Sequence, residues 1–345
     1  MGSDYKPPYH ITDKTTNLIA EIVQLAGQIE LKEEARDTLR LRRESRIKTI
    51  HSSLAIEQNI LTVEQVTAVI GGKKVLAPPK DIKEVLNAYT IYDHIDELDP
   101  YSVKDLLYAH KVMMGELIKD AGSFRSGNVG VYDGDVLIHA GTPAKYVPDL
   151  VQNLFDWLKN TDVHPLVASC VFHYEFEFIH PFSDGNGRTG RFWHTLILSK
   201  WKPIFAWIPV ETIVYNNQKA YYAAIERSTA DTDCAPFIEF MLGAICDAVK
   251  LYVKQTDQVT DQVTDQVTDQ VTDQVLTPDD KINMLLSKLG NETLSALEIM
   301  ERLGLSHRPT FRSNYLVPAL NSGVIEMTIP EKPNSSKQKY RARKN

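Results

Sequence analysis

Residues 180–191 combine, within one short stretch, the side chains that phosphoryl or nucleotidyl transfer requires. His180 can take or give a proton near neutral pH, and Asp184 offers the hard oxygen ligand that Mg²⁺ prefers. Arg188 and Arg191 carry permanently charged, planar groups that suit phosphate oxygens. A base, a metal ligand and two anion-binding cations together favour phosphoryl or nucleotidyl transfer over other chemistries.

The segments on either side of this stretch predict the two elements that position it. Residues 165–179 are mostly apolar or aromatic and predict a buried helix that ends at Pro181. Residues 187–200 predict a second helix with its own apolar stripe. The Gly-Asn-Gly turn at 185–187 therefore lies at a helix N-terminus, where backbone N–H groups and the helix dipole favour an anion.

A Gly-Asn-Gly turn by itself has an alternative explanation: it could simply connect two helices, with the two arginines exposed to solvent. The complete string His-Pro-Phe-Ser-Asp-Gly-Asn-Gly-Arg-Thr-Gly-Arg, however, resembles the signature of Fic-domain enzymes, His-Pro-Phe-x-Asp/Glu-Gly-Asn-Gly-Arg-x-x-Arg, at every specified position. The resemblance implies AMPylation, the transfer of AMP from Mg-ATP to a protein hydroxyl. It also implies a mainly α fold, a Fic-type helical bundle with a β-hairpin flap.

The resemblance assigns roles to the residues of this stretch. It implies that His180 deprotonates a Tyr, Thr or Ser hydroxyl of a target protein, and that Asp184 holds Mg²⁺. Arg188 is expected at the β-phosphate and Arg191 at the γ-phosphate, while Phe182 locks the loop against the core. The residues expected around the ATP are Phe182, Gly185, Asn186, Gly187, Arg188, Gly190, Arg191 and, at the adenine and ribose, Tyr222.

Residues 52–59 alone predict the end of a helix with a surface acid at Glu57. Beside a Fic signature they resemble the inhibitory motif of that family, Ser/Thr-x-x-x-Glu-Gly/Asn, with Ser53 and Glu57 in place. A carboxylate at Glu57 would pair with Arg191 and hold it away from the γ-phosphate. The sequence departs from the pattern at Gln58, where Gly or Asn is usual.

Two β-rich runs around Asp-Gly predict a hairpin over residues 128–139. A surface hairpin without function is the alternative. The resemblance implies a flap over the active site, whose edge at Val129, Gly130 and Val131 binds the target segment by strand addition.

The rest of the chain predicts a helical scaffold and a separate C-terminal module. A charged helix is expected over 33–50, and its arginines (Arg36, Arg40, Arg42, Arg43 and Arg46) are expected to form a solvated face. An apolar helix is expected over 234–253. The expected domains are an N-terminal helical region at 1–100 with the inhibitory helix at about 45–58, the catalytic core at 101–254, a solvated and part-helical linker of five Thr-Asp-Gln-Val copies within 255–276, and a winged helix-turn-helix at 277–345.

The C-terminal module has a basic balance, with eleven Lys or Arg against seven Asp or Glu. Ser295 and Glu298 predict a capping box that opens one helix, and Gly304 a turn before a second. DNA binding through His307, Arg308 and Arg312 and docking of a protein both stay open for this module. The partners expected elsewhere are the target protein and the chain itself, by self-AMPylation, and a homodimer stays open.

Composition narrows the function classes. The chain has 345 residues and a net charge of −7, which argues against wholesale binding to nucleic acid or membrane. Its three scattered cysteines and the lack of a signal-like or membrane-spanning stretch predict a cytoplasmic protein.

Two alternatives to AMP transfer remain. Glu57 could orient a water for AMP removal in the same site, or the protein could be a DNA-binding regulator whose Fic core only senses nucleotide.

Overall fold

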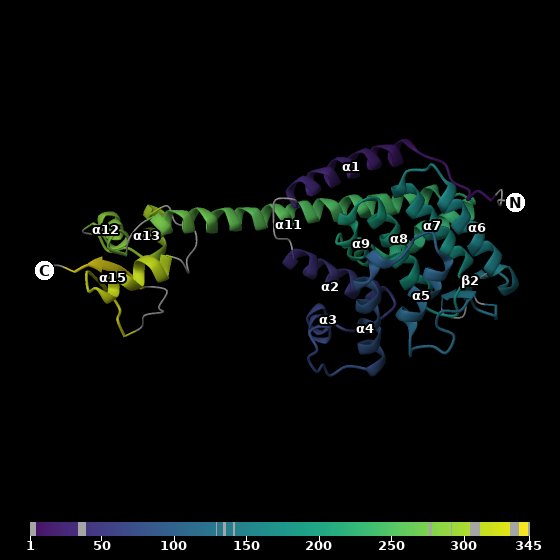
Figure 1. Ribbon diagram of the computed structural model, residues 1–345, viewed down its shortest axis with the longest axis horizontal. Coiled ribbons are helices and arrows are strands. Elements are labelled where there is room, and N and C mark those ends of the chain that lie inside the picture. The colour runs from purple at the N-terminus through teal and green to yellow at the C-terminus, as the bar shows by residue number, and fades with distance from the viewer. Residues whose placement is uncertain are drawn as a thin grey trace. The chain divides into compact units, whose positions relative to one another are not determined.

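The computed structural model describes residues 5–33, 39–128, 130–133, 136–140, 142–275, 278–290, 292–303, 311–331 and 338–343. These residues are mainly helical, as the sequence predicts, with two short β-hairpins (Figure 1). The chain divides into two compact units, Met1–Lys254 and Gln255–Asn345. The first unit has two hydrophobic cores and the second unit has one.

Two consecutive helices form the centre of the first unit. They are α7 (Pro165–Ile179) and α8 (Asn186–Trp201), which confirm the two helices predicted around the signature. Helix α7 ends at His180, whose φ of 52° lies in the left-handed region. Helix α8 begins after Gly185, which also has a positive φ, of 83°. The chain thus reverses between the two helices within a few residues, because two positions adopt backbone angles that end a right-handed helix.

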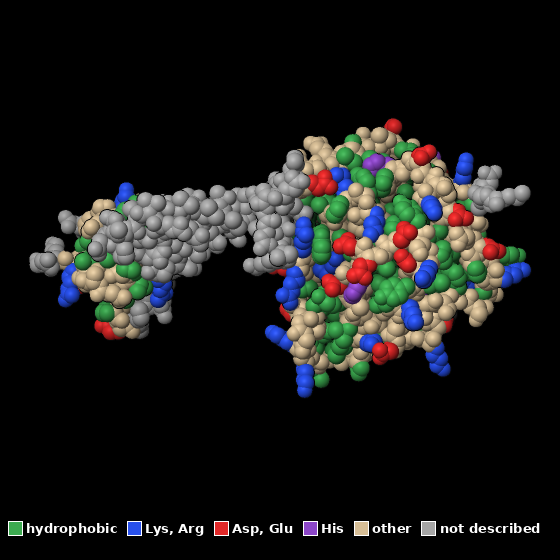
Figure 2. All heavy atoms as spheres, in the orientation of Figure 1, with side chains coloured by type: hydrophobic (Ala, Val, Ile, Leu, Met, Phe, Trp, Pro, Cys, Tyr) green, Lys and Arg blue, Asp and Glu red, His purple; other side chains and the backbone are tan. Residues whose placement is uncertain are grey.

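Helix α7 is buried on nearly all sides because it contributes to two cores. Its Phe172 and Phe176 join a core with α2 (Leu39–Ile56), α3 (Val63–Ile70), α4 (Pro79–Asp93), α5 (Val103–Met114) and α6 (Val147–Asn160). Its Val167 and Val171 join a core with α1 (Asp13–Glu33), α9 (Val210–Asn216), α10 (Gln218–Asp231) and α11 (Ala235–Val275). Figure 2 shows acidic and basic side chains interspersed on the visible face of this unit.

The segment that resembles the inhibitory motif lies at the C-terminal end of α2. The Asn59 N–H donates to the Leu54 carbonyl at 3.1 Å, and the Gln58 N–H to the Ala55 carbonyl at 3.0 Å. This is the hydrogen-bond pattern of a Schellman motif, with Gln58 at the left-handed position and a φ of 67°. The geometry explains why Gly or Asn is usual where this chain has Gln58.

The expectation of a solvated arginine face on α2 is wrong at Arg46. This side chain is buried, and its guanidinium lies 4.5 Å from the centre of the Trp207 ring and 5.3 Å from that of Tyr92. Arg43 is exposed, as expected. The two rings come from distant segments, so the charge pattern of α2 alone could not identify the buried arginine.

The predicted hairpin is present. Strands β1 (Gly130–Asp133) and β2 (Val136–Ala140) pair in antiparallel fashion, with Val131 opposite His139 and an irregularity between Val131 and Tyr132. Val129, the first residue of the predicted docking edge, lies outside the described residues.

The closing helix is longer than expected. It was predicted over 234–253, but α11 runs from Ala235 to Val275 and includes all five Thr-Asp-Gln-Val copies. Among the described residues, no helix combines the length and apolar character needed to cross a membrane.

The second unit is small and α+β. Its elements are α12 (Pro278–Leu289), α13 (Ala296–Leu303), a π-helical turn (Arg312–Leu316), α15 (Val317–Asn321), β3 (Ile325–Met327) and β4 (Tyr340–Ala342). The Ser295 capping box is confirmed, because the Glu298 N–H donates to Ser295 Oγ and the Ser295 N–H to Glu298 Oε2. Gly304, His307 and Arg308 lie outside the described residues.

Candidate active site

Hydrogen bonds within the loop between α7 and α8, and packing of Phe182 on His110, fix the conformation of this loop. The Asn186 amide donates to the Phe182 carbonyl at 2.9 Å and accepts from the Phe182 N–H at 2.8 Å. Phe182 is fully buried and stacks on His110, with the ring centres 3.6 Å apart. Since His110 Nδ1 accepts from the Gly122 N–H, its Nε2–H donates to the Asp184 carbonyl at 3.0 Å. Both polar atoms of Asn186 are thus used within the loop, and its role at the phosphates stays a prediction.

His110 is buried, and it supports the backbone of Asp184, the residue predicted to hold Mg²⁺. Burial lowers the pKa of His110, which keeps the ring neutral and preserves this arrangement of donor and acceptor. The sequence held no local signal for this role, because the ring reaches a backbone carbonyl 74 positions away.

His180 begins this loop, and hydrogen bonds from Arg125 connect its backbone to the two ends of the hairpin segment. The buried Arg125 donates from Nε to the His180 carbonyl at 2.6 Å, and from Nη1 to the Gly127 carbonyl at 2.9 Å. Its Nη2 donates to the carbonyl of Thr142, on the far side of the hairpin. Sequence reasoning missed Arg125, because its partners are carbonyls of distant segments that carry no residue-type signal.

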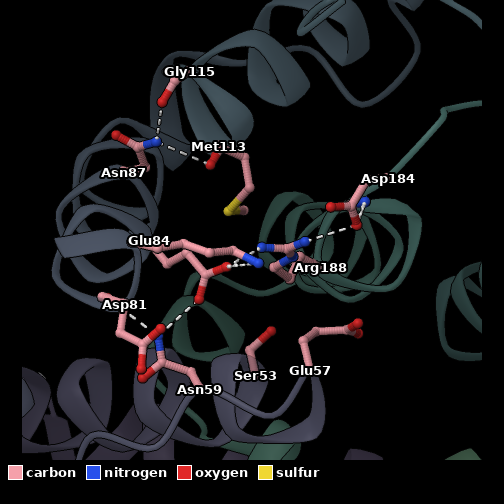
Figure 3. Close-up of polar contacts among 12 residues, drawn as sticks. Ser53, Glu57, Asn59, Asp81, Glu84, Asn87, Met113, Gly115, Asp184 and Arg188 are labelled. Carbon is pink, nitrogen blue, oxygen red and sulfur yellow. Dashed lines mark hydrogen bonds and ion pairs between the residues drawn. The ribbon is translucent and has the colours of Figure 1, made fainter. Parts of the chain in front are cut away.

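Arg191 is bound by the segment at the end of α2. Its Nη2 donates to Glu57 Oε1 at 2.7 Å and to the Ser53 carbonyl at 3.0 Å, while its Nε donates to Ser53 Oγ at 3.1 Å. Figure 3 shows Ser53 and Glu57 pointing to the same side of their segment. The Arg191 side chain is 3% exposed and that of Glu57 is 30% exposed. The ion pair predicted from the sequence is therefore present.

The Glu57 carboxylate lies against the first turn of α8. A Cβ atom at Gly187 would collide with Glu57 Oε1 and lie 2.9 Å from Arg191 Nη1, so a larger residue there would force these two side chains to shift. Free N–H groups and the helix dipole at this end of α8 favour an anion. Glu57 thus covers the surface on which the sequence predicts a nucleotide phosphate.

Arg188 is held by a second buried acid, which sequence reasoning missed. Glu84 Oε1 accepts from Arg188 Nη1 at 3.0 Å, and Glu84 Oε2 accepts from the Asn59 amide at 2.8 Å (Figure 3). The other branch of the Arg188 guanidinium donates to Asp184 Oδ1, also at 3.0 Å. Glu84 belongs to a charged, amphipathic helix, where an acid four positions after Lys80 has the pattern of a surface pair.

Asp184 is suited to a cation that arrives with a nucleotide. Its side chain is 50% exposed, and its Oδ1 accepts from Arg188 and from the Gly185 N–H at 2.6 Å. Within the described part of the chain, no group of three or more His, Cys, Asp or Glu side chains could hold a metal by itself. A single exposed carboxylate fits Mg²⁺, which usually keeps several waters and binds through one or two carboxylates and substrate phosphates.

Tyr222 and Gly190 were both expected at the nucleotide. Tyr222 is half-exposed on α10, beside the buried Tyr221, and partial burial, with the nearby Glu57 charge, raises its pKa. Gly190 is buried against α7, where an added Cβ would lie 2.8 Å from Glu177 Oε1. The structure thus places Tyr222 near the ion pair of Glu57 and Arg191, and Gly190 in a packing contact between α7 and α8.

Comparison with known proteins bears on both units. Residues 98–198 match the Fic/DOC family, and residues 280–342 match "Filamentation induced by cAMP protein Fic-like, C-terminal domain". A Fic family protein from Desulfovibrio desulfuricans G20, of known crystal structure, is 48% identical; each chain covers 99% of the other, with a TM-score of 0.72. The chain belongs to the Fic family.

Other Fic proteins are more distant. The "Protein adenylyltransferase Fic" of Nematostella vectensis is 29% identical over 227 residues, which are 62% of this chain and 50% of that protein. The "Protein adenylyltransferase fic-1" of Caenorhabditis elegans is 29% identical over 222 residues, 59% of this chain and 40% of that protein. The chain thus spans half or less of these curated relatives. The solved structure of Fic-1 from C. elegans, at 21% identity and a TM-score of 0.59, shares the fold over 71% of this chain.

Proposed function

We propose that this Fic protein is a protein adenylyltransferase, which transfers AMP from Mg-ATP to a Tyr, Thr or Ser hydroxyl of a target protein or of itself. The observation that carries the proposal is the convergence of His180, Asp184 and both signature arginines around the N-terminus of α8. The names of the two curated relatives support the same activity.

His180 acts as the general base. Its Nδ1 lies 3.3 Å from the Glu177 carbonyl, so a proton on Nδ1 is held there and Nε2 is the ring nitrogen that accepts the proton of the target hydroxyl. The hydroxyl oxygen then forms a bond to the α-phosphorus of ATP. The bond from that phosphorus to the bridging oxygen breaks, and pyrophosphate leaves.

The phosphates bind at the N-terminus of α8, where the Arg188 guanidinium contacts Asp184 and the Arg191 guanidinium contacts Glu57. Asp184 would hold Mg²⁺, which supplies charge neutralisation of the phosphates when bound. The backbone edge of the flap, at Gly130 and Val131, positions the target segment by strand addition.

Glu57 restrains this activity. It occupies the phosphate side of Gly187 and uses Arg191 as its partner, so nucleotide binding must displace a charge-assisted hydrogen bond. Loss of the carboxylate is expected to raise AMP transfer.

The test is incubation of the wild type and of Glu57→Gly with α-labelled ATP and Mg²⁺, followed by intact mass. A control is Glu116→Gly, which removes an exposed acid at a position of positive φ, where glycine is tolerated. An AMP adduct that is stronger in Glu57→Gly, unchanged in the control and absent from His180→Ala supports the proposal. No adduct in any variant contradicts it, whereas faster loss of a preformed adduct in the wild type than in Glu57→Gly would favour AMP removal.

The C-terminal unit belongs to the proposal as a docking module of winged helix-turn-helix type. Its two consecutive helical regions and the β3–β4 hairpin after them support this arrangement. Retention of the biological effect by His180→Ala, with its loss in Arg312→Ala, would favour the DNA-binding regulator over the enzyme.

A further inference from the structure

Glu177 is a partly buried acid beside the proposed base. It lies on the last turn of α7, three residues before His180, so both side chains share one face of the helix. Its side chain is 13% exposed, and its Oε2 lies 4.0 Å from His180 Nδ1. Its Oε1 lies 3.9 Å from His173 Nε2, and within the described residues this oxygen has no hydrogen-bond partner.

The packing of α8 is adapted to this carboxylate. The signature leaves position 190 unspecified, and this chain has glycine there. A Cβ at Gly190 would lie 2.8 Å from Glu177 Oε1 and 3.2 Å from Phe176. The glycine therefore leaves space for the Glu177 carboxylate, whose burial costs free energy. If this side chain only filled space, an apolar residue would do so at a lower cost in free energy of folding.

The groups around Glu177 come from three other helices as well as its own. Arg191 faces it from α8, Glu57 from the end of α2, and Tyr221 and Tyr222 from α10. On α7 its neighbours are His180 and His173, and burial lowers the pKa of His173, which stays neutral. Burial raises the pKa of Glu177 to about 7, Arg191 opposes this shift, and the Glu57 carboxylate adds to it. Removal of Glu57 therefore favours the ionised form of Glu177.

We propose that Glu177 is a positioning residue for His180: its carbonyl accepts the Nδ1–H, so that Nε2 faces the substrate, and its carboxylate, 4.0 Å from Nδ1, stabilises by its charge the imidazolium that forms. The inference rests on the proposed function, in which His180 is the base. In the reaction the hydroxyl proton moves to His180 Nε2, the ring becomes a cation, and Glu177 gains no proton. Displacement of Glu57 then has two effects, because it frees Arg191 and favours the ionised form of Glu177.

The first test is an NMR titration of the His180 imidazole, which does not depend on AMP transfer. Spectra of Glu57→Gly are compared with those of Glu57→Gly/Glu177→Gln, and His180→Ala identifies the resonance. An ionised carboxylate about 4 Å away raises the pKa of a histidine by roughly one or more. We expect the glutamine variant to lower the pKa of His180 by about one. An unchanged pKa would overturn the inference.

The matched control is Glu175→Gln in the same background. Glu175 also lies on α7 and is buried, but its partner is the Tyr5 hydroxyl at 2.6 Å, so the pKa of His180 should not change. Glutamine is isosteric with glutamate and neutral, so Glu177→Gln should fold. Glu177→Asp keeps the charge on a shorter chain and should restore part of the pKa.

The second test is the pH profile of kcat/KM for AMP transfer in the same variants. With Glu177→Gln the acidic limb should move to lower pH by about one and the plateau should fall about tenfold, because a less basic ring is a weaker base. A fall in rate without movement of the limb would indicate a structural role and contradict the inference. If Glu57→Gly transfers no AMP at all, the proposed function fails, while the titration still decides the role of Glu177.

Discussion

Replacing Glu57 by glycine removes one acceptor from Arg191 and leaves the two from Ser53 in place. The lost contact is a 2.7 Å hydrogen bond between a buried guanidinium and a carboxylate that is 30% exposed. Such charged bonds contribute about 1.5–3 kcal/mol, and the exposure of Glu57 argues for about 2 kcal/mol. Because ATP must break this contact to reach Arg191, its dissociation constant should fall about 30-fold in the variant.

The assay is calorimetric titration with Mg-ATP in a His180→Ala background, where no AMP is transferred during the measurement. His180→Ala/Glu57→Gly should bind about 30-fold more tightly than His180→Ala. Glu57→Gln should lie between them, because its amide oxygen still accepts a neutral hydrogen bond of about 1 kcal/mol. Glu116→Gly in the same background should bind like its parent. Equal dissociation constants in all four proteins would refute the argument that this contact restrains nucleotide binding.

Three further changes test the support of the site. Glu84→Gln leaves Arg188 without its buried counter-charge, so AMP transfer by Glu57→Gly should fall at least about tenfold and the free energy of unfolding by about 2–3 kcal/mol; unchanged rates would remove Glu84 from the site. Gln58→Gly should raise the free energy of unfolding by about 0.5–1 kcal/mol in urea titrations, because the residue has a φ of 67°, and a loss of stability would contradict the cap geometry. Since the folded pKa of Glu177, about 7, exceeds its usual 4.5, wild-type stability should fall as pH rises from about 4.5 to about 7, by about 3 kcal/mol from this group. Glu177→Gln should lack this loss and gain stability over the wild type at pH 8, and parallel pH–stability curves would show that Glu177 ionises normally.

The last prediction gives the placement of Glu177 a physical meaning. A carboxyl group that is destabilising when ionised in the folded state costs stability at neutral pH. Such a cost is expected where a residue serves the reaction instead of the fold. The glycine at 190 agrees with this view, as does Glu177 Oε1, which has no hydrogen-bond partner in the part of the chain that the structure describes.

The sequence by itself determined the parts of the protein that depend on neighbouring residues. Helices α7 and α8, the hairpin and the Ser295 cap are specified by apolar periodicity, turn residues and capping side chains within a few positions. The contact between Glu57 and Arg191 spans 134 positions, and it was predictable only because both residues lie in motifs with a known arrangement.

Only the tertiary structure decided which other charged residues belong to the site. Four charged residues have the local pattern of surface residues but are covered by distant segments. Glu84, Arg125 and Arg46 are buried, and the side chain of Glu177 is only 13% exposed. Their partners are a guanidinium from another helix, backbone carbonyls, aromatic rings and a glycine 13 positions away. Burial and the pKa shift that follows depend on everything within a few ångströms in space, and that neighbourhood is set by helix packing, which local sequence patterns do not encode.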